Sequence, residues 1–176
     1  ALEGPERYPA SCANETEDRA LEGPVMDTVD VSAYFSARAL EYHERQTDAW
    51  CGMHALNHLL GGEYVTKDAC SRAARLIATR LSQDEGEHVD HENGWLSIDV
   101  INLLGAAQYD FHVEEKPTHG NEIYNLTGNL AILVNCNNQH WTLIQHAESM
   151  DVWIYRDSRR TGREVFQSMQ EIQRCR

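Results

Sequence analysis

One stretch of the chain decides how the rest is interpreted: His43-Glu-Arg-Gln46-Thr-Asp-Ala-Trp-Cys51-Gly-Met-His54-Ala-Leu-Asn57-His-Leu-Leu60. Its second half predicts a helix over 51–60, because apolar residues recur there at helical spacing and Gly61-Gly62 ends the run. Cys51 then begins a helix, where the helix dipole favours a thiolate, the nucleophilic form of cysteine. A cysteine in an apolar helix is more often a core residue, so this position alone assigns no role.

A histidine and a carboxylate come together in the C-terminal half. Strands are predicted over 139–146 and 151–157, joined by a turn at 147–150, and this register places His140 directly opposite Asp157. A carboxylate beside a histidine orients the ring and stabilises its protonated form. The alternative is an ordinary polar pair at a strand end, and a slip of one residue in the register would separate the two side chains.

Further helices are expected on both sides of this hairpin. A second helix is predicted over 66–83, and a third is predicted to start after Ser97, whose hydroxyl can cap it. A last helix is predicted to begin at Thr161, because Thr161-Gly-Arg-Glu164 has the spacing of a capping box.

Two more strands are predicted over 109–114 and 130–136, because both segments are rich in β-branched and aromatic residues. The helices therefore come first and the strands later. This order predicts an α+β domain with N-terminal helices and an antiparallel sheet, and it disfavours a parallel α/β fold.

Length and composition predict one domain with an extension. The chain has 176 residues, and three of its four prolines lie within the first 24. Residues 1–40 carry eight acids and three bases, and we expect them to form a partly flexible extension preceding a catalytic domain over 41–176. The first 20 residues do not show the pattern of a signal peptide, which is a basic start followed by an apolar stretch.

Charge and cysteine content narrow the partners and the compartment. The net charge of −13 disfavours binding to nucleic acid or an anionic membrane. No apolar run reaches the roughly 20 residues of a membrane span. Five cysteines without a Cys-x-x-Cys pair argue against a disulfide framework and a structural zinc site. We expect a reducing compartment, cytoplasmic or nuclear, and a monomer.

Taken together, a helix-start cysteine followed by a His–Asp pair has the chain order of a papain-like cysteine hydrolase. In that arrangement His140 takes the Cys51 proton, Asp157 holds the imidazole ring, and the thiolate attacks a carbonyl. The tetrahedral intermediate needs donors for its oxyanion, for which the Gln46 side-chain amide and the Cys51 backbone N–H are candidates. An exposed loop glutamine is the alternative for Gln46.

The opening stretch resembles the Josephin domain, the catalytic module of ataxin-type and Josephin-type deubiquitinases. That family opens with His-Glu-x-Gln followed by Cys-x-x-His-x-Leu-Asn-x-Leu-Leu. Three later segments resemble its next helix, its catalytic histidine segment and its third-residue segment: Gly94-Trp-Leu-Ser97-Ile-Asp-Val-Ile101, Asn135-Cys-Asn-Asn-Gln-His140-Trp141 and Tyr155-Arg-Asp157-Ser158. The blocks follow the family's order and cover roughly residues 42–173.

The resemblance implies a papain-like fold and a cysteine-type deubiquitinase that cleaves after the C-terminal glycines of ubiquitin or polyubiquitin. It implies Cys51, His140 and Asp157 as the triad, Gln46 as the oxyanion residue, and no metal or organic cofactor. Two ubiquitin-contact surfaces carry over in part. One matches Ile98 and Asp99, and the other matches Tyr64 and Val65, although Gln108 stands where family members can have an aromatic. If these positions are core, the carry-over fails.

One segment departs from the family. Residues 82–94 replace a longer helical arm of ataxin-type members, and we expect an acidic loop that leaves the cleft more open. The acids around His88 and His91 predict a solvated loop, not a metal site, because such a cluster has no supporting hydrogen-bond shell.

Two other functions remain compatible with the sequence. One is a ubiquitin-binding regulatory module whose triad is silent until it is switched on, because activity depends on cleft geometry to about an ångström. The other is a papain-like hydrolase, either a peptidase or an acyl transferase, that acts on a substrate other than ubiquitin.

Overall fold

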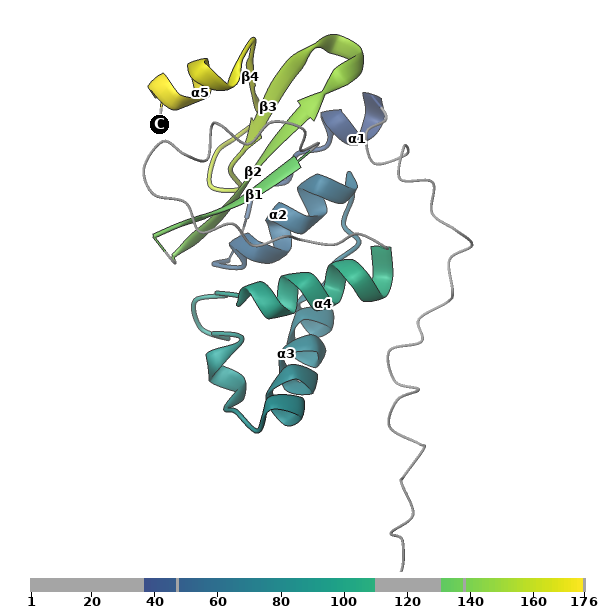
Figure 1. Ribbon diagram of the computed structural model, residues 1–176, viewed down its shortest axis with the longest axis vertical. Coiled ribbons are helices and arrows are strands. Elements are labelled where there is room, and N and C mark those ends of the chain that lie inside the picture. The colour runs from purple at the N-terminus through teal and green to yellow at the C-terminus, as the bar shows by residue number, and fades with distance from the viewer. Residues whose placement is uncertain (1–36, 47, 110–130, 138, 176) are drawn as a thin grey trace, which may run out of the picture.

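A computed structural model describes residues 37–46, 48–109, 131–137 and 139–175, and the fold is α+β, as the order of elements predicts. Helices and strands follow one another as α1 Ala37–Glu41, α2 Cys51–Leu60, α3 Lys67–Leu81, η3 Glu85–Glu87, α4 Ile98–Tyr109, β1 Ala131–Cys136, β2 His140–Ala147, η5 Glu148–Met150, β3 Val152–Arg156, β4 Glu164–Phe166 and α5 Met169–Cys175. The four strands form one antiparallel sheet in the order β1-β2-β3-β4. In Figure 1, α2 lies against the sheet, and α3 and α4 lie beyond α2.

Two of the apolar cores pack helices against the two faces of the sheet. The larger core joins α2, α3 and α4 to Trp141 of β2, and the smaller core packs α5 against the sheet through Ile144 and Tyr155. Neighbouring residues of a strand point to opposite faces, so Trp141 and Ile144 reach different cores. Among the described residues, no helix is long and apolar enough to cross a membrane.

The helices predicted at 51–60, 66–83 and after Ser97 are confirmed. The Thr66 hydroxyl accepts a hydrogen bond from the Ala69 N–H at 3.2 Å, and the Ser97 hydroxyl accepts one from the Val100 N–H at 3.3 Å. Gly61 ends α2 with φ 75°, a left-handed conformation that suits glycine.

The predicted helix start at Thr161 is wrong. Residues 164–166 form β4, and the helix begins at Met169. The capping box lies at Ser168, whose hydroxyl accepts from the Glu171 N–H at 3.3 Å, while the Glu171 carboxylate accepts from the Gln167 N–H at 2.7 Å. Thr161–Glu164 and Ser168–Glu171 have the same capping-box spacing, but residues 164–166 pair with β3, so a helix follows only the later of the two.

The strands predicted at 130–136, 139–146 and 151–157 are confirmed as β1, β2 and β3. The predicted strand at 109–114 is not tested beyond its first residue: Tyr109 ends α4, and 110–114 lies outside the described residues.

The register of the β2–β3 hairpin differs from the prediction by two residues. Ala147 pairs with Val152 and Leu143 pairs with Arg156, so His140 is not directly opposite Asp157. The turn spans residues 148–151 because η5 is followed by Asp151 at φ 50°. A shift of two residues keeps each side chain on its predicted face, and a diagonal contact therefore remains possible.

The segment 82–94 is more ordered than a solvated loop. His88 is 3% exposed, and its ring lies between Gln83 Oε1 at 3.0 Å and Ser97 Oγ at 3.3 Å. Val89 is buried and forms an isolated β-bridge with Leu96. The prediction of a solvated loop is therefore wrong for His88 and Val89, which belong to the packed body of the domain.

Candidate functional site

Cys51 begins α2 with its thiol against strand β2. Only 3% of the residue is exposed. The Trp141 backbone N–H donates a hydrogen bond to Cys51 Sγ at 3.3 Å, which favours the thiolate over the thiol. The contact joins the start of the helix to the start of the strand, across 90 residues of chain.

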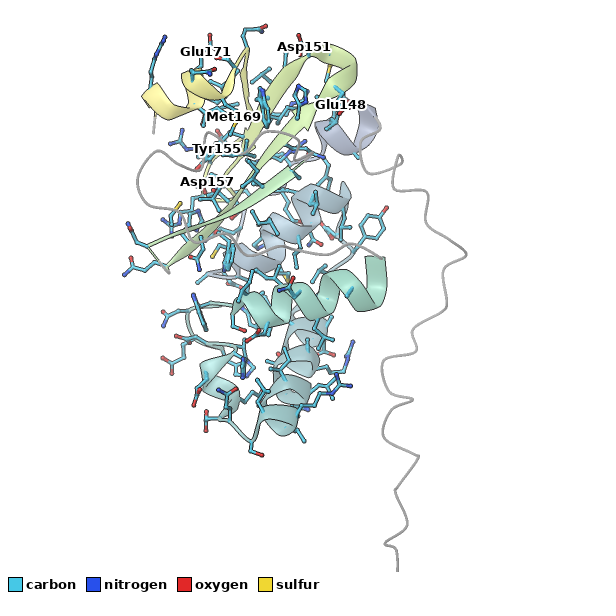
Figure 2. The ribbon with its side chains drawn as sticks, in the orientation of Figure 1. Glu148, Asp151, Tyr155, Asp157, Met169 and Glu171 are labelled. Carbon is cyan, nitrogen blue, oxygen red and sulfur yellow. The ribbon has the colours of Figure 1, made fainter. Side chains whose placement is uncertain are left out.

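His140 lies next to this contact and is paired with a carboxylate. Its Nε2 donates to Asp157 Oδ1 at 2.8 Å, as a diagonal contact between β2 and the residue that follows β3. Asp157 also accepts from the Arg159 backbone N–H at 2.9 Å and has the Arg160 guanidinium at 3.8 Å. Figure 2 shows Asp157 toward the α2 end of the sheet, far from Glu148 and Asp151 at the hairpin turn.

The electrostatics of the site favour a charged pair. Burial raises the pKa of the Cys51 thiol, but hydrogen bonding to His140 and Trp141 outweighs it, and the pKa lies below its ordinary value. For His140, burial lowers the pKa, but hydrogen bonding to Asp157 and Cys51 raises it to about 9. Cys70, buried in the helical core without such partners, has its pKa raised to about 12 by burial. Two buried cysteines thus differ because only one faces an imidazole.

The second ring nitrogen of His140, Nδ1, is the one that is not bonded to Asp157. Nδ1 is buried and has no partner, among the described residues, that satisfies strict hydrogen-bond geometry. The ring nevertheless interacts with Cys51 closely enough to shift the pKa of both groups. Nδ1 is the ring nitrogen that Asp157 does not use, so it is the atom of His140 that remains for proton exchange with a neighbouring group.

Gln46 is fixed to the residue that follows Asp157. Its backbone N–H donates to the Ser158 carbonyl at 2.8 Å, and the Ser158 hydroxyl donates to Gln46 Oε1 at 2.6 Å. Because the amide oxygen is held by a hydroxyl donor, the amide NH₂ is left to point elsewhere as a donor. Ser158 is itself buried, so this orientation is sheltered from water.

The expected second oxyanion donor is engaged elsewhere. The Cys51 N–H donates to the Ala49 carbonyl at 2.8 Å across Trp50, whose φ −76° and ψ 50° are those of an inverse γ-turn. The prediction that this N–H is available to an oxyanion is therefore wrong for this conformation. A rotation of the Trp50–Cys51 peptide would free it.

The chain matches no protein-family model and no curated protein. The chemistry of the site therefore rests on its own side chains. A buried thiol, a protonated imidazole, a paired carboxylate and an oriented amide are the groups that nucleophilic attack on a carbonyl requires.

The segment that leads to Cys51, residues 40–46, is held by a buried arginine that the sequence analysis missed. Arg156 donates from Nη2 to the Leu40 carbonyl at 2.5 Å and from Nε to the Tyr42 carbonyl at 3.2 Å. Its Nη1 donates to Gln145 Oε1 at 2.5 Å on β2. Leu40 and Ala39 are buried, so residues at the end of the predicted extension pack into the domain. The sequence feature that could have indicated this role is the position of Arg156 within a predicted strand.

A second feature that the local sequence pattern did not predict is the partly buried carboxylate of Glu44. It accepts from His54 Nδ1 at 2.5 Å and from Asn57 Nδ2 at 3.1 Å, and the Tyr42 hydroxyl donates to its other oxygen. Burial raises the pKa of Glu44, but hydrogen bonds from His54, Tyr42 and Asn57 outweigh it and lower the pKa. The carboxylate thereby ties residues 40–46 to two buried side chains of α2. The sequence feature that could have indicated these contacts is the Cys-x-x-His-x-x-Asn pattern of α2 shortly after Glu44.

His58, one turn beyond His54, has a different role. Its Nε2 is the acceptor for the Glu44 N–H at 3.1 Å, and its ring stacks on His43 with centroids 4.8 Å apart. Burial lowers the pKa of His58 to about 3, so the ring is neutral at physiological pH. It therefore packs under the segment 40–46 without adding charge.

The predicted substrate-contact residues divide into exposed and buried. Tyr64 is 55% exposed and Asp99 is also exposed, whereas Val65 is 2% exposed and belongs to the helical core. Ile98 is half-buried and packs against the same core. The prediction for Val65 is therefore wrong, since its side chain cannot reach a partner, and the side chain of Gln108 lies outside the described residues.

Proposed function

We propose that the protein is a cysteine-type deubiquitinase with a papain-like, Josephin-type fold. The observation that supports this most strongly is the pairing of Cys51 with the His140–Asp157 couple, which favours a thiolate and an imidazolium at one buried site. No metal or organic cofactor is needed for this chemistry. Ubiquitin as substrate is supported by the motif resemblance of four segments.

The proposed reaction assigns one step to each of these side chains. The Cys51 thiolate attacks the carbonyl carbon of the bond after the last glycine of ubiquitin, and the Gln46 amide NH₂ donates to the developing oxyanion. The His140 imidazolium gives its proton to the departing amine. Water, deprotonated by His140, then releases ubiquitin from the thioester, and Asp157 keeps Nε2 protonated throughout.

The buried nucleophile supports a substrate with a narrow tail. At 3% exposure, Cys51 lies behind other atoms, and a glycine tail, which has no side chains, is the kind of chain segment that approaches such a thiol most closely. Tyr64, after α2, and Asp99, in the first turn of α4, remain the exposed candidates for contact with the body of ubiquitin.

The test is reaction with ubiquitin that carries a thiol-reactive group at its C-terminus, followed by intact mass. We expect one ubiquitin adduct on the wild type and none on Cys51→Ala. Cys136→Ala is the matched control, because Cys136 is the exposed cysteine of the described chain. Loss of the adduct in Cys136→Ala with retention in Cys51→Ala would refute the assignment.

A silent triad is the second candidate, and one contact favours it. While the Cys51 N–H donates to Ala49, one of the two donors proposed for the oxyanion is occupied, and the Gln46 amide is the other. A module in this state binds ubiquitin without hydrolysing it. It would react with a small alkylating reagent at Cys51 but give no ubiquitin adduct. A thioester formed with a different acyl donor would instead favour a hydrolase for another substrate.

A further inference from the structure

We propose that Arg159 is a specificity residue that selects an acidic peptide segment beside the scissile bond of the substrate. The inference rests on the proposed function, since it assigns a preference to the protein from which ubiquitin is removed. Four observations support this proposal. They are the positive charge of residues 156–164, the partners of the neighbouring arginines, the contact of Arg159 with Asp157, and the open surface at residues 159–164.

The turn between β3 and β4 is basic in an acidic protein. Residues 156–164 contain four arginines and two acids, a net of +2 in a chain whose total is −13. A ligand with negative charge is repelled by most of the molecule and attracted here. The same overall charge disfavours nucleic acid as the ligand, because a polyanion extends well beyond one turn.

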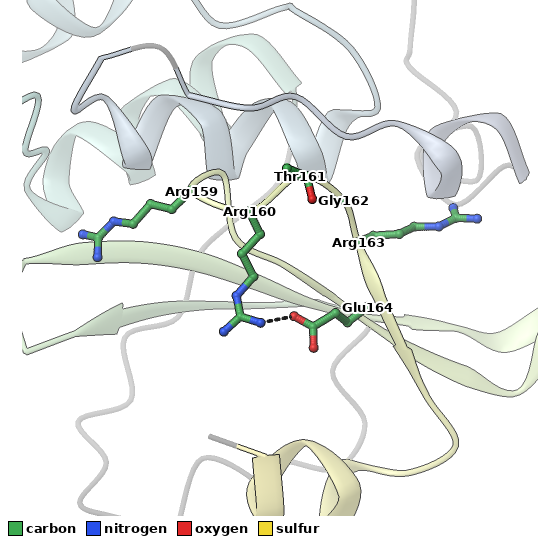
Figure 3. Close-up of a pocket in the computed structure, with 6 residues that line it drawn as sticks. All are labelled: Arg159, Arg160, Thr161, Gly162, Arg163 and Glu164. Carbon is green, nitrogen blue, oxygen red and sulfur yellow. Dashed lines mark hydrogen bonds and ion pairs between the residues drawn. The ribbon is translucent and has the colours of Figure 1, made fainter.

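Three of the four arginines already have partners. Arg156 is buried on the segment 40–46, Arg160 pairs with Glu164 at 2.6 Å, and Arg163 donates to the Leu40 carbonyl. Figure 3 shows Arg160 directed at Glu164, with Arg159 and Arg163 extending to opposite sides of the turn.

Arg159 is exposed, and among residues 37–46, 48–109, 131–137 and 139–175 its guanidinium has no carboxylate partner. Among the arginines that the structure describes in this turn, Arg160 pairs with a carboxylate and Arg163 donates to a carbonyl, so the donors of Arg159 are the ones most open to a ligand. Arginine presents a planar fork of donors that matches a carboxylate, which favours Asp and Glu side chains as the group recognised.

Arg159 is also close to the reacting groups. Its backbone N–H donates to Asp157 Oδ1 at 2.9 Å, and Asp157 lies only two residues before Arg159 in the turn. The charge of Arg159 contributes to lowering the pKa of both Cys51 and Asp157, although burial and direct hydrogen bonds have larger effects. An open hollow lined by residues 159–164 leaves room for a side chain of the ligand (Figure 3).

The experiment compares two acceptor peptides, each joined through a lysine to the ubiquitin C-terminus by an isopeptide bond. The peptides have equal length, with three glutamates or three lysines flanking the joined lysine. The readout is the ratio of kcat/KM for the acidic acceptor to that for the basic one. Within one variant this ratio cancels any effect of the substitution on Cys51 itself.

For the wild type we expect a preference of about threefold for the acidic acceptor at low salt, weakening as salt is added. Arg159→Glu should reverse the preference, so that the ratio changes about tenfold, and Arg159→Lys should retain most of it. Arg72→Glu is the matched control: it makes the same charge change on the exposed face of α3 and should leave the ratio unchanged.

The outcomes separate the two proposals. If ubiquitin with a reactive C-terminus, which has no acceptor peptide, gives an adduct but Arg159→Glu keeps the wild-type ratio, the specificity role is overturned and the proposed function stands. A ratio that changes equally in Arg72→Glu overturns it as well, because net charge would then be the cause. If no adduct forms, both proposals are refuted.

Discussion

Ser158 and Gln46 are joined twice, once through the Gln46 N–H and the Ser158 carbonyl and once through the Ser158 hydroxyl and the Gln46 side chain. The double connection fixes both the position of the loop before Cys51 and the rotation of the amide. The amide NH₂ is therefore oriented before any substrate arrives, which is the condition for stabilising an oxyanion without reorganisation.

The first prediction follows from this pair. Gln46→Ala should lower kcat by about 100-fold, and Ser158→Ala should lower it by about tenfold, because the amide is then free to rotate. The measurement is steady-state hydrolysis of ubiquitin with a fluorogenic C-terminal amide, with KM expected to change little. A Ser158→Ala enzyme with unchanged kcat and an intact fold would show that the hydroxyl does not orient the amide.

The second prediction concerns the pH dependence of kcat/KM. The lowered pKa of Cys51 sets an acid limb, and the raised pKa of His140, about 9, sets an alkaline limb, because the departing amine needs a proton from the imidazolium. Asp157→Asn removes a group that raises the His140 pKa, so the alkaline limb should move to lower pH. An alkaline limb that stays in place would mean that Asp157 does not stabilise the imidazolium.

The third prediction tests the buried arginine. Arg156→Met removes the donor to the Tyr42 carbonyl and to Gln145 Oε1, and leaves the Leu40 carbonyl to Arg163, so it should reduce the free energy of unfolding by about 3 kcal/mol, as measured in urea. Burial, followed by the nearby Arg163, lowers the pKa of Arg156 to about 10, so the group is still charged at neutral pH. The exposed Arg174→Met should change stability by less than about 0.5 kcal/mol. Equal effects of the two substitutions would contradict the anchoring role.

The fourth prediction tests the support behind the nucleophile. Gly94 has φ 64°, and a Cβ added there would lie 2.5 Å from the Ala49 carbonyl carbon and 2.5 Å from the Trp50 nitrogen. Gly94→Ala should therefore displace the backbone before Cys51, destabilise the fold by about 2 kcal/mol, and slow alkylation of Cys51. Gly162→Ala has no atom within 4 Å of its new Cβ and serves as the control. Unchanged unfolding and alkylation in Gly94→Ala would refute this contact.

Local patterns in the sequence predicted most of the helices and strands. The helical spacing after Cys51, the capping hydroxyl of Ser97 and the β-branched and aromatic content of residues 139–146 depend on near neighbours in the chain, and each corresponds to an element of the structure. Thr161 shows the limit of such patterns. Its capping-box spacing is genuine, but the pairing of β4 with β3 determines the conformation there, and that pairing is a tertiary interaction.

The candidate site could be predicted in part for the same reason. The contact between His140 and Asp157 survives a two-residue error in register, because strand periodicity fixes the face and not the partner. The burial of Val65 and the anchoring by Arg156 were not predictable from local pattern. Both depend on which distant segments pack together, and one sequence alone does not show this.

The tripeptide Arg156-Asp157-Ser158 has a consequence for the order of events during synthesis. Its side chains hold the Leu40 carbonyl, His140 and Gln46, and the first and last of these contacts span 116 and 112 residues of chain. A contact across such a loop forms only after both of its residues have been synthesised. Cys51 is therefore made long before the segment 156–158 that completes its site. A nascent chain stalled on the ribosome before residue 156 has emerged should carry an ordinary, unactivated cysteine. The His140–Asp157 pair beside Cys51 then forms only after β3 and the residue that follows it have been made.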